Sequence, residues 1–122
     1  MSDQVQTWCD LGEAYLSIGW YAMALQSFRE AVAIDPQCAA AWRKLALVHE
    51  RAGQMQLAVE VLEEATRLNP RDILLWEALG VCHHHCRKPL LMREVHNALR
   101  EIDAESAQQF YEKFIKRINS FW

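Results

Sequence analysis

The sequence predicts an all-α protein, built as a solenoid of three antiparallel helix pairs and one closing helix, seven helices in all. Two features of its composition favour helices. The chain of 122 residues has only four Gly and three Pro, so little of it can be loop. Ala, Leu, Glu, Gln and Arg, which are good helix formers, are abundant. The third and strongest observation is that the sequence repeats itself.

The repeat has a period of 34 residues, which separates Trp8 from Trp42 and Trp42 from Trp76. Further series keep the same step: Leu11, Leu45 and Leu79; Gly12, Ala46 and Gly80; Ala24 and Ala58; Phe28 and Leu62; Ala31 and Ala65; Pro36 and Pro70. So many series with one period predict repeat units at about 5–38, 39–72 and 73–106. A closing helix at about 107–122 follows, and we expect all these parts to form a single domain, 1–122.

Each repeat unit is expected to hold two helices. In the first unit, apolar residues recur at i, i+3, i+7 and i+10 and predict the first helix: Trp8, Leu11, Tyr15 and Ile18. Gly19 ends this helix, because the left-handed cap is easily adopted by glycine. Ala24, Phe28 and Ala31 mark the second helix, which Asp35-Pro36 stops, because the residue before proline avoids the helical region.

The same signals recur further along the chain. Gly53 and Asn69-Pro70 punctuate the second unit in the same way. Gly12 and Gly80 lack a side chain, so the paired helix can approach closely at these positions. The second unit is therefore expected to repeat the helix pair of the first.

The third unit and the closing segment depart from the pattern. Arg87-Lys88-Pro89 stands where a glycine turn is expected, and Pro89 suits the first turn of the next helix. Met92, His96 and Leu99 replace the Ala, Phe or Leu, and Ala of the other units. In the closing helix the residues spaced by four are expected to cover the third pair: Phe110, Phe114 and Ile118. Additional apolar surface comes from Tyr111, Ile115, Phe121 and Trp122.

These motifs resemble the signature of the tetratricopeptide repeat family. The resemblance lies in Trp8-x-x-Leu11-Gly12-x-x-Tyr15, followed by Ala24-x-x-x-Phe28 and Pro36. The second unit matches with Ala46 in place of the glycine and His49 in place of the tyrosine. One helical hairpin cannot bury its own apolar face, so neighbouring pairs must stack. The resemblance implies a right-handed superhelix whose concave groove is formed mainly by the first helix of each pair.

The repeat register predicts which residues line this groove. They are Glu13, Leu16, Arg43, Lys44, Leu47, Glu50, Arg51, Glu77, Val81, His84, His85, Tyr111 and Ile115. The predicted surface is mixed in charge, with an aliphatic seam of Leu16, Leu47 and Val81. Such a surface suits an extended or helical peptide with apolar anchors. We therefore expect a protein-interaction module or adaptor that binds a segment of a partner protein.

One specific binding mode of the family is disfavoured. Some members hold the C-terminal carboxylate of chaperones with Lys, Asn and Arg side chains in the groove. At the matching positions this chain has Cys9, Glu13, Lys44, Leu74 and Ala78. Only Lys44 could donate to a carboxylate, and Glu13 would repel one. The sequence therefore argues against a receptor for chaperone tails.

Two alternatives remain open. The aromatic closing helix could dock on another copy and make the chain a self-assembling scaffold or homo-oligomer, since large exposed apolar patches mark interaction sites. More remotely, Cys82, His85 and Cys86 lie at i, i+3 and i+4 and could converge on one metal ion. The repeat register places both cysteines at positions held by small apolar residues elsewhere, which favours packing, so no metal site is predicted.

Charge and composition exclude other classes of function. The 13 basic residues are scattered among 16 acidic ones, without the basic cluster that nucleic-acid binding requires. The sequence contains no run of about 18 apolar residues, so no membrane span is predicted. The opening residues lack the features of a signal peptide, which predicts a cytoplasmic protein with reduced cysteines. No phosphate loop, dinucleotide fingerprint or nucleophile motif is present, so neither an enzyme nor a cofactor is expected.

Overall fold

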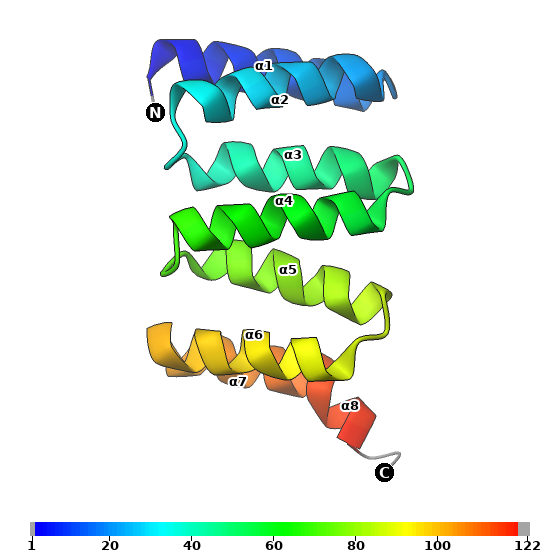
Figure 1. Cartoon of the computed structure of the whole chain (residues 1–122), viewed down its shortest axis with the longest axis vertical. Coiled ribbons are helices and arrows are strands. Elements are labelled where there is room, and N and C mark those ends of the chain that lie inside the picture. Colours follow the sequence, from blue (N-terminus) through cyan, green and yellow to red (C-terminus); the bar gives the residue numbers. More distant parts are fainter. Residues whose placement is uncertain (1, 120–122) are drawn as a thin grey trace. The chain divides into compact units, whose positions relative to one another are not determined.

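The computed structural model describes the backbone of residues 2–119 and the side chains of residues 2–117, and this part of the chain is helical with short connections (Figure 1). The helices are α1 (Asp3–Ser17), α2 (Tyr21–Ile34), α3 (Ala39–Arg51), α4 (Met55–Leu68), α5 (Ile73–His85), α6 (Pro89–Ile102), α7 (Ala104–Phe110) and α8 (Lys116–Asn119). A π-helical turn, η1 (Tyr111–Ile115), joins α7 to α8 without a break. The predicted all-α class is confirmed.

The contacts between helices fall into two compact units, residues 1–70 (unit 1) and 71–122 (unit 2). In unit 1, α1 packs on α2, α2 on α3, and α3 on α4. In unit 2, α5 packs on α6, and α6 packs on α7 and η1. Each unit has its own buried apolar side chains.

The turn between the two helices of a pair recurs at the same repeat position. Gly19 and Gly53 adopt positive φ angles of 78° and 76°. In the third pair Arg87 takes this conformation, with a φ of 56°, although it carries a side chain. The turn therefore survives the loss of glycine, and Pro89 begins α6 as predicted.

The recurring Trp and Pro residues contact each other where one repeat joins the next. The indole N–H of Trp42 donates to the backbone carbonyl of Pro36, over 2.8 Å. This bond ties the start of α3 to the connection between α2 and α3.

Glycine permits close packing in both units, but different rings fill the space. A Cβ added to Gly12 would lie 2.7 Å from Cζ of Phe28, on the paired helix α2. A Cβ added to Gly80 would lie 2.5 Å from Cζ of Phe110, on α7. At Gly12 the close contact thus comes from the paired helix, as expected, whereas at Gly80 the paired helix contributes only Cγ1 of Val95, at 3.1 Å. In unit 2 the ring comes from the closing segment, because His96 stands at the position equivalent to Phe28.

The closing segment differs from its prediction in start and register. It begins at Ala104, where the side chain of Asp103 accepts a hydrogen bond from the backbone N–H of Ser106, over 3.2 Å. The predicted inward row was Phe110, Phe114 and Ile118, but Ala107, Phe110 and Ile115 are the residues buried here. The N–H of Lys116 bonds to the carbonyl of Tyr111, five residues back, and this π turn rotates the inward face by one residue. The side chain of Ile118 and all of Phe121 and Trp122 lie outside the described residues.

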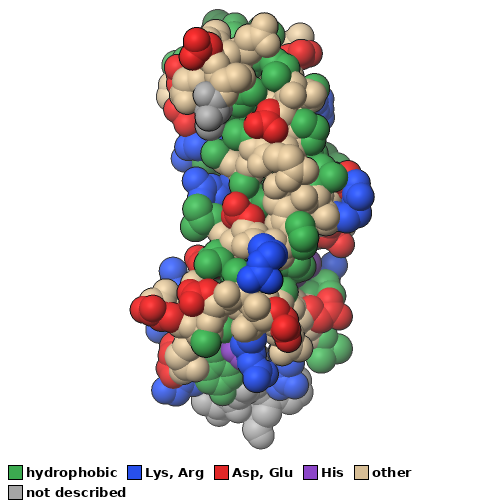
Figure 2. Space-filling model, turned by 90° about the vertical axis from the view of Figure 1, so that its left-hand side faces the viewer, with side chains coloured by type: hydrophobic (Ala, Val, Ile, Leu, Met, Phe, Trp, Pro, Cys, Tyr) green, Lys and Arg blue, Asp and Glu red, His purple; other side chains and the backbone are tan. Residues whose placement is uncertain are grey.

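The charge pattern of the sequence is also seen on the molecular surface. On the face in Figure 2, acidic and basic side chains are interspersed and no large area carries a single sign.

Among residues 2–119, no helix combines the length and the apolar character needed to cross a bilayer.

Candidate binding site

In unit 1, the predicted binding residues form a charged surface on α1 and α3. Nζ of Lys44 lies 3.1 Å from Oε1 of Glu13, so this ion pair joins the two helices. Arg43, Leu47 and Glu50 are half-buried beside it on α3, and Arg51 is exposed. Most of the predicted residues in unit 1 are therefore accessible to a partner.

Leu16 is an exception, and its prediction was wrong. Its side chain is only 7% exposed and belongs to the core cluster of unit 1. The buried stripe of α1 runs through Val5, Cys9, Gly12 and Leu16, which continue one helical face, whereas Glu13 lies outside it. Leu16 therefore stabilises the fold instead of offering an apolar anchor point.

Cys9 lies on the same buried stripe. Burial raises the pKa of its thiol, and the nearby Cys38 and acidic residues raise it further. A thiol in this setting is mostly protonated and a poor nucleophile.

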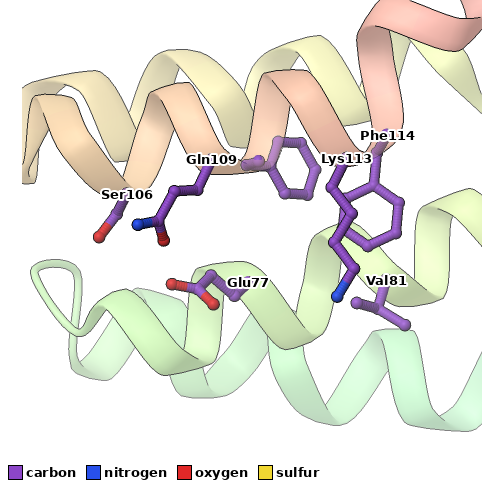
Figure 3. A pocket seen from close by; sticks show the side chains of 7 residues that line it. Glu77, Val81, Ser106, Gln109, Lys113 and Phe114 are labelled. Carbon is purple, nitrogen blue, oxygen red and sulfur yellow. The ribbon is translucent and has the colours of Figure 1, made fainter.

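In unit 2, a pocket of about 160 Å³ lies between α5 and the closing segment (Figure 3). Its walls are Glu77 and Val81 from α5, and Ser106, Gln109, Phe110, Lys113 and Phe114 from α7 and η1. In Figure 3 the carboxylate of Glu77 points toward Ser106 and Gln109, and the amine of Lys113 extends toward Val81. Glu77 and Val81 were both predicted as binding residues, and here they line a cavity.

The aromatic wall of this pocket is well packed. The rings of Phe110 and Phe114 lie 5.1 Å apart between centroids, tilted by 46°. Nζ of Lys113 lies 5.4 Å from the centroid of Phe114, a distance at which a cation is attracted to the ring face. The ring of His84, another predicted residue, lies 5.1 Å from that of Phe114. The pocket thus combines apolar rings with one acidic and one basic group.

The remaining predicted binding residues of unit 2 have different outcomes. His85 is exposed on the last turn of α5, with its ring 5.9 Å from that of His84. Tyr111 does not line the pocket but packs against His96 of α6, at 5.6 Å between ring centroids. Ile115 is 4% exposed, so its prediction as a binding residue was wrong. The π turn explains the burial of Ile115, because it turns Ile115 inward and Phe114 toward the pocket.

The Cys–His run does not assemble a metal site. Cys82 is buried, Cys86 is half-buried and His85 is exposed, so the three candidate ligands point into different surroundings. Among the described residues, no group of three or more His, Cys, Asp and Glu side chains is placed to hold a metal ion. The burial of Cys82 matches the expectation that it packs as a small apolar residue.

Five pocket residues were missed by the sequence interpretation of the binding surface: Ser106, Gln109, Phe110, Lys113 and Phe114. One signal was available for them. Phe110 follows Trp76 by 34 residues, so the aromatic series of the repeat continues into the closing segment. Extending the register would have marked this segment as the first helix of a further unit. Nothing in the sequence indicates the π turn, which determines the direction in which the side chain of Phe114 points.

With this arrangement established, comparison with known proteins identifies the family. The model of the tetratricopeptide repeat family matches residues 9–73, more than half of the chain. This chain belongs to the tetratricopeptide repeat family. The resemblance drawn from its Trp, Gly, Ala and Pro series is therefore confirmed. No curated protein matches the chain.

Solved structures of tetratricopeptide repeat domains share the fold. The domain of Sgt2 from Aspergillus fumigatus has a TM-score of 0.78 and 19% identity, over 97% of this chain and 81% of that one. The first such domain of Spaghetti (RPAP3), bound to the HSP90 peptide SRMEEVD, has a TM-score of 0.76 and 16% identity, over 98% and 96%. The TPR2B domain of yeast Sti1, in complex with pHsp70, gives 0.76 and 16%, over 95% and 99%. At these identities the similarity establishes the fold.

Proposed function

We propose that this chain is a protein-interaction module, an adaptor that holds a peptide segment of a partner protein by an apolar side chain seated in the unit 2 pocket. The pocket is the observation that carries this proposal. Its apolar walls, Val81, Phe110 and Phe114, offer burial to an aliphatic or aromatic side chain. Its polar groups, Glu77, Gln109 and Lys113, can bond to the peptide around that anchor.

The size of the pocket favours a side chain over a whole small molecule. Pockets for drug-sized ligands and cofactors measure roughly 300–1,000 Å³. The unit 2 pocket measures about 160 Å³, below that range. A single anchor residue inserted from a longer peptide fits this volume better, as in interfaces where a few buried side chains supply most of the affinity.

The proposed peptide is not held by its C-terminal carboxylate. Two of the similar domains carry HSP90 or Hsp70 ligands. A ligand held by its C-terminal carboxylate would need cationic donors on this chain. Five positions of this chain match the carboxylate-binding residues of the family. Only Lys44 among them is cationic, and it is already paired with Glu13. Cys9 is buried and Leu74 is an exposed apolar residue. We therefore propose an internal segment with an apolar anchor as the partner.

Mutation of the pocket tests the proposal. Peptides selected from a random display library on the wild-type chain would be measured by isothermal titration calorimetry against Val81→Asp. We expect affinity to fall about tenfold or more, because a carboxylate would enter the apolar wall where the anchor is buried. Leu74→Asp is the matched control, since Leu74 is exposed on the same helix and does not line the pocket.

Circular dichroism would verify that both variants keep their helix content. If Val81→Asp binds the selected peptides as tightly as the wild type does, the pocket is not the binding site. If Leu74→Asp weakens binding and Val81→Asp does not, another face of α5 holds the peptide.

A further inference from the structure

The first helix exposes a face that is buried in the later repeats. Leu11 is 39% exposed, whereas Leu45 and Leu79, at the equivalent positions, are 4% exposed each. Ala14 is exposed too, whereas its equivalents Val48 and Cys82 are fully buried. The difference lies in the surroundings of α1, because the Leu residues are identical in all three repeats.

Two neighbouring apolar side chains extend this face. Ile18 is 59% exposed and lies one helical turn beyond Ala14 and Tyr15. Trp20 is 58% exposed and stacks on Tyr15, with 6.0 Å between the ring centroids and 19° between the planes. Leu11, Tyr15, Ile18 and Trp20 thus form one apolar surface, which we name the α1 face.

Leu11, Ile18 and Trp20 are all exposed, and a contiguous apolar surface on a folded domain marks an interaction site. The proposed peptide pocket lies in unit 2, so the α1 face is a separate surface and stands on separate observations.

The equivalent face of α3 indicates what fits on α1. Within unit 1, α2 packs against α3. Leu45 and Val48 of α3 share one core cluster with Phe28 and Val32 of α2. The face of α3 that corresponds to the α1 face is therefore covered by an α-helix with an apolar stripe.

The charges of α1 indicate which side chains should flank the apolar stripe of a helix docked on the α1 face. α1 contains Asp3, Asp10 and Glu13 and no Lys or Arg. Glu13 is paired with Lys44 on α3. Asp3, Thr7 and Asp10 recur at i, i+4 and i+7 and form a row along α1 beside the α1 face, where Asp10 accepts a hydrogen bond from the side-chain amide of Gln6, over 2.7 Å. A second copy of α1 would place acid against acid, which is unfavourable. A basic flank would complement these carboxylates.

We propose that the α1 face docks a basic amphipathic helix of a partner protein. The apolar stripe of that helix covers Leu11, Tyr15 and Ile18, as α2 covers α3. Its Lys or Arg residues lie beside Asp3 and Asp10. The partner recognises this surface by its shape and charge, and this binding does not involve the unit 2 pocket.

A peptide derived from the sequence of α2 tests this proposal. A fluorescein-labelled peptide with the sequence of Tyr21–Ile34 would carry Lys in place of Gln26, Glu30 and Ala33, and a second peptide would carry Glu at these positions. We expect the basic peptide to bind the wild-type chain about tenfold more tightly than the acidic one, with a smaller gap at high salt. Fluorescence anisotropy measures both affinities.

Leu11→Lys should weaken binding of the basic peptide about tenfold, because it places a cation in the apolar contact. Ile18→Lys is a second variant at a more exposed position, should Leu11→Lys perturb folding. Leu57→Lys is the matched control, since Leu57 is 42% exposed on α4 of the same unit. It should bind as the wild type does.

Several results would overturn the proposal. They are the absence of binding by the basic peptide, equal binding of the acidic one, and equal binding to the Leu11→Lys and Ile18→Lys variants. Sedimentation velocity adds one more. If the wild type dimerises and Leu11→Lys does not, a second copy covers the α1 face instead of a basic helix.

Discussion

Gly12 and Phe28 share one small space in the core of unit 1, and their sizes are matched. The Phe28 ring is fully buried and lies where a Cβ of residue 12 would point. The second repeat has Ala46 and Leu62 at the two equivalent positions, both buried. A larger residue on the first helix thus coincides with a smaller one on the second. The pair, not either residue alone, sets the distance between the helices.

We predict that Gly12→Ala destabilises the fold although alanine is the better helix former. Overpacking costs about 1–3 kcal/mol, and the gain in helix propensity offsets about 1 kcal/mol of it. The double variant Gly12→Ala with Phe28→Leu, which reproduces the second repeat, should recover part of this loss. Urea denaturation of both single variants, the double variant and the wild type measures the coupling. An alanine variant as stable as the wild type would contradict this account.

We expect His96 to make the stability of unit 2 depend on pH. Its ring packs against Tyr111, and burial lowers its pKa, with a further contribution from Arg100. A histidine with a lowered pKa in the folded state is protonated first in the unfolded chain. The stability it contributes is therefore present above the unfolded pKa, about 6.5, and is lost as the pH falls below that value.

We therefore expect the free energy of unfolding to decrease between about pH 7.5 and about pH 5.5. In His96→Gln the decrease should be smaller, because the titrating ring is absent. Urea denaturation at both pH values gives the four free energies required. The comparison uses the change with pH within each variant, so a constant effect of the substitution cancels. An identical decrease in both proteins would exclude His96 as a contributor.

At the scale of the helices, the features that depend on local sequence were predictable. The 34-residue series gave the helix pairs, and Gly19, Gly53, Pro36 and Pro70 gave their ends. These signals act through backbone conformation within a few residues, so one sequence suffices to read them. The turn is kept even at Arg87, whose φ is 56° although it carries a side chain.

The candidate binding surface was predicted only in part, because it depends on how each helix is rotated about its axis. Leu16 was assigned to the surface, but the buried stripe of α1 continues through it. Ile115 was assigned by assuming an unbroken α-helical register, which the π turn shifts. Such turns arise from the packing of the whole segment and often lie at functional sites. Here the shift moves Phe114 into the wall of the pocket.

At the scale of the whole molecule, the chain consists of units that carry their own cores. In a repeat protein, stability is approximately a sum of repeat and neighbour terms, so parts of the array can open separately. Unit 1 is centred on Phe28 and its cluster, and unit 2 buries Leu79, Val95 and Phe110. A substitution confined to one core should therefore act mainly on that unit.

Gly80→Ala tests this at the centre of unit 2. The added Cβ would lie 2.5 Å from Cζ of Phe110 and 3.1 Å from Cγ1 of Val95, and both of these side chains are buried. Overpacking of about 1–3 kcal/mol should result. We expect hydrogen exchange, read by mass spectrometry, to accelerate in peptides from α5 to α7, whereas peptides from α1 and α2 keep their protection. Equal acceleration along the chain would mean that both units unfold as one cooperative body, since the loss in unit 2 would then reach every helix.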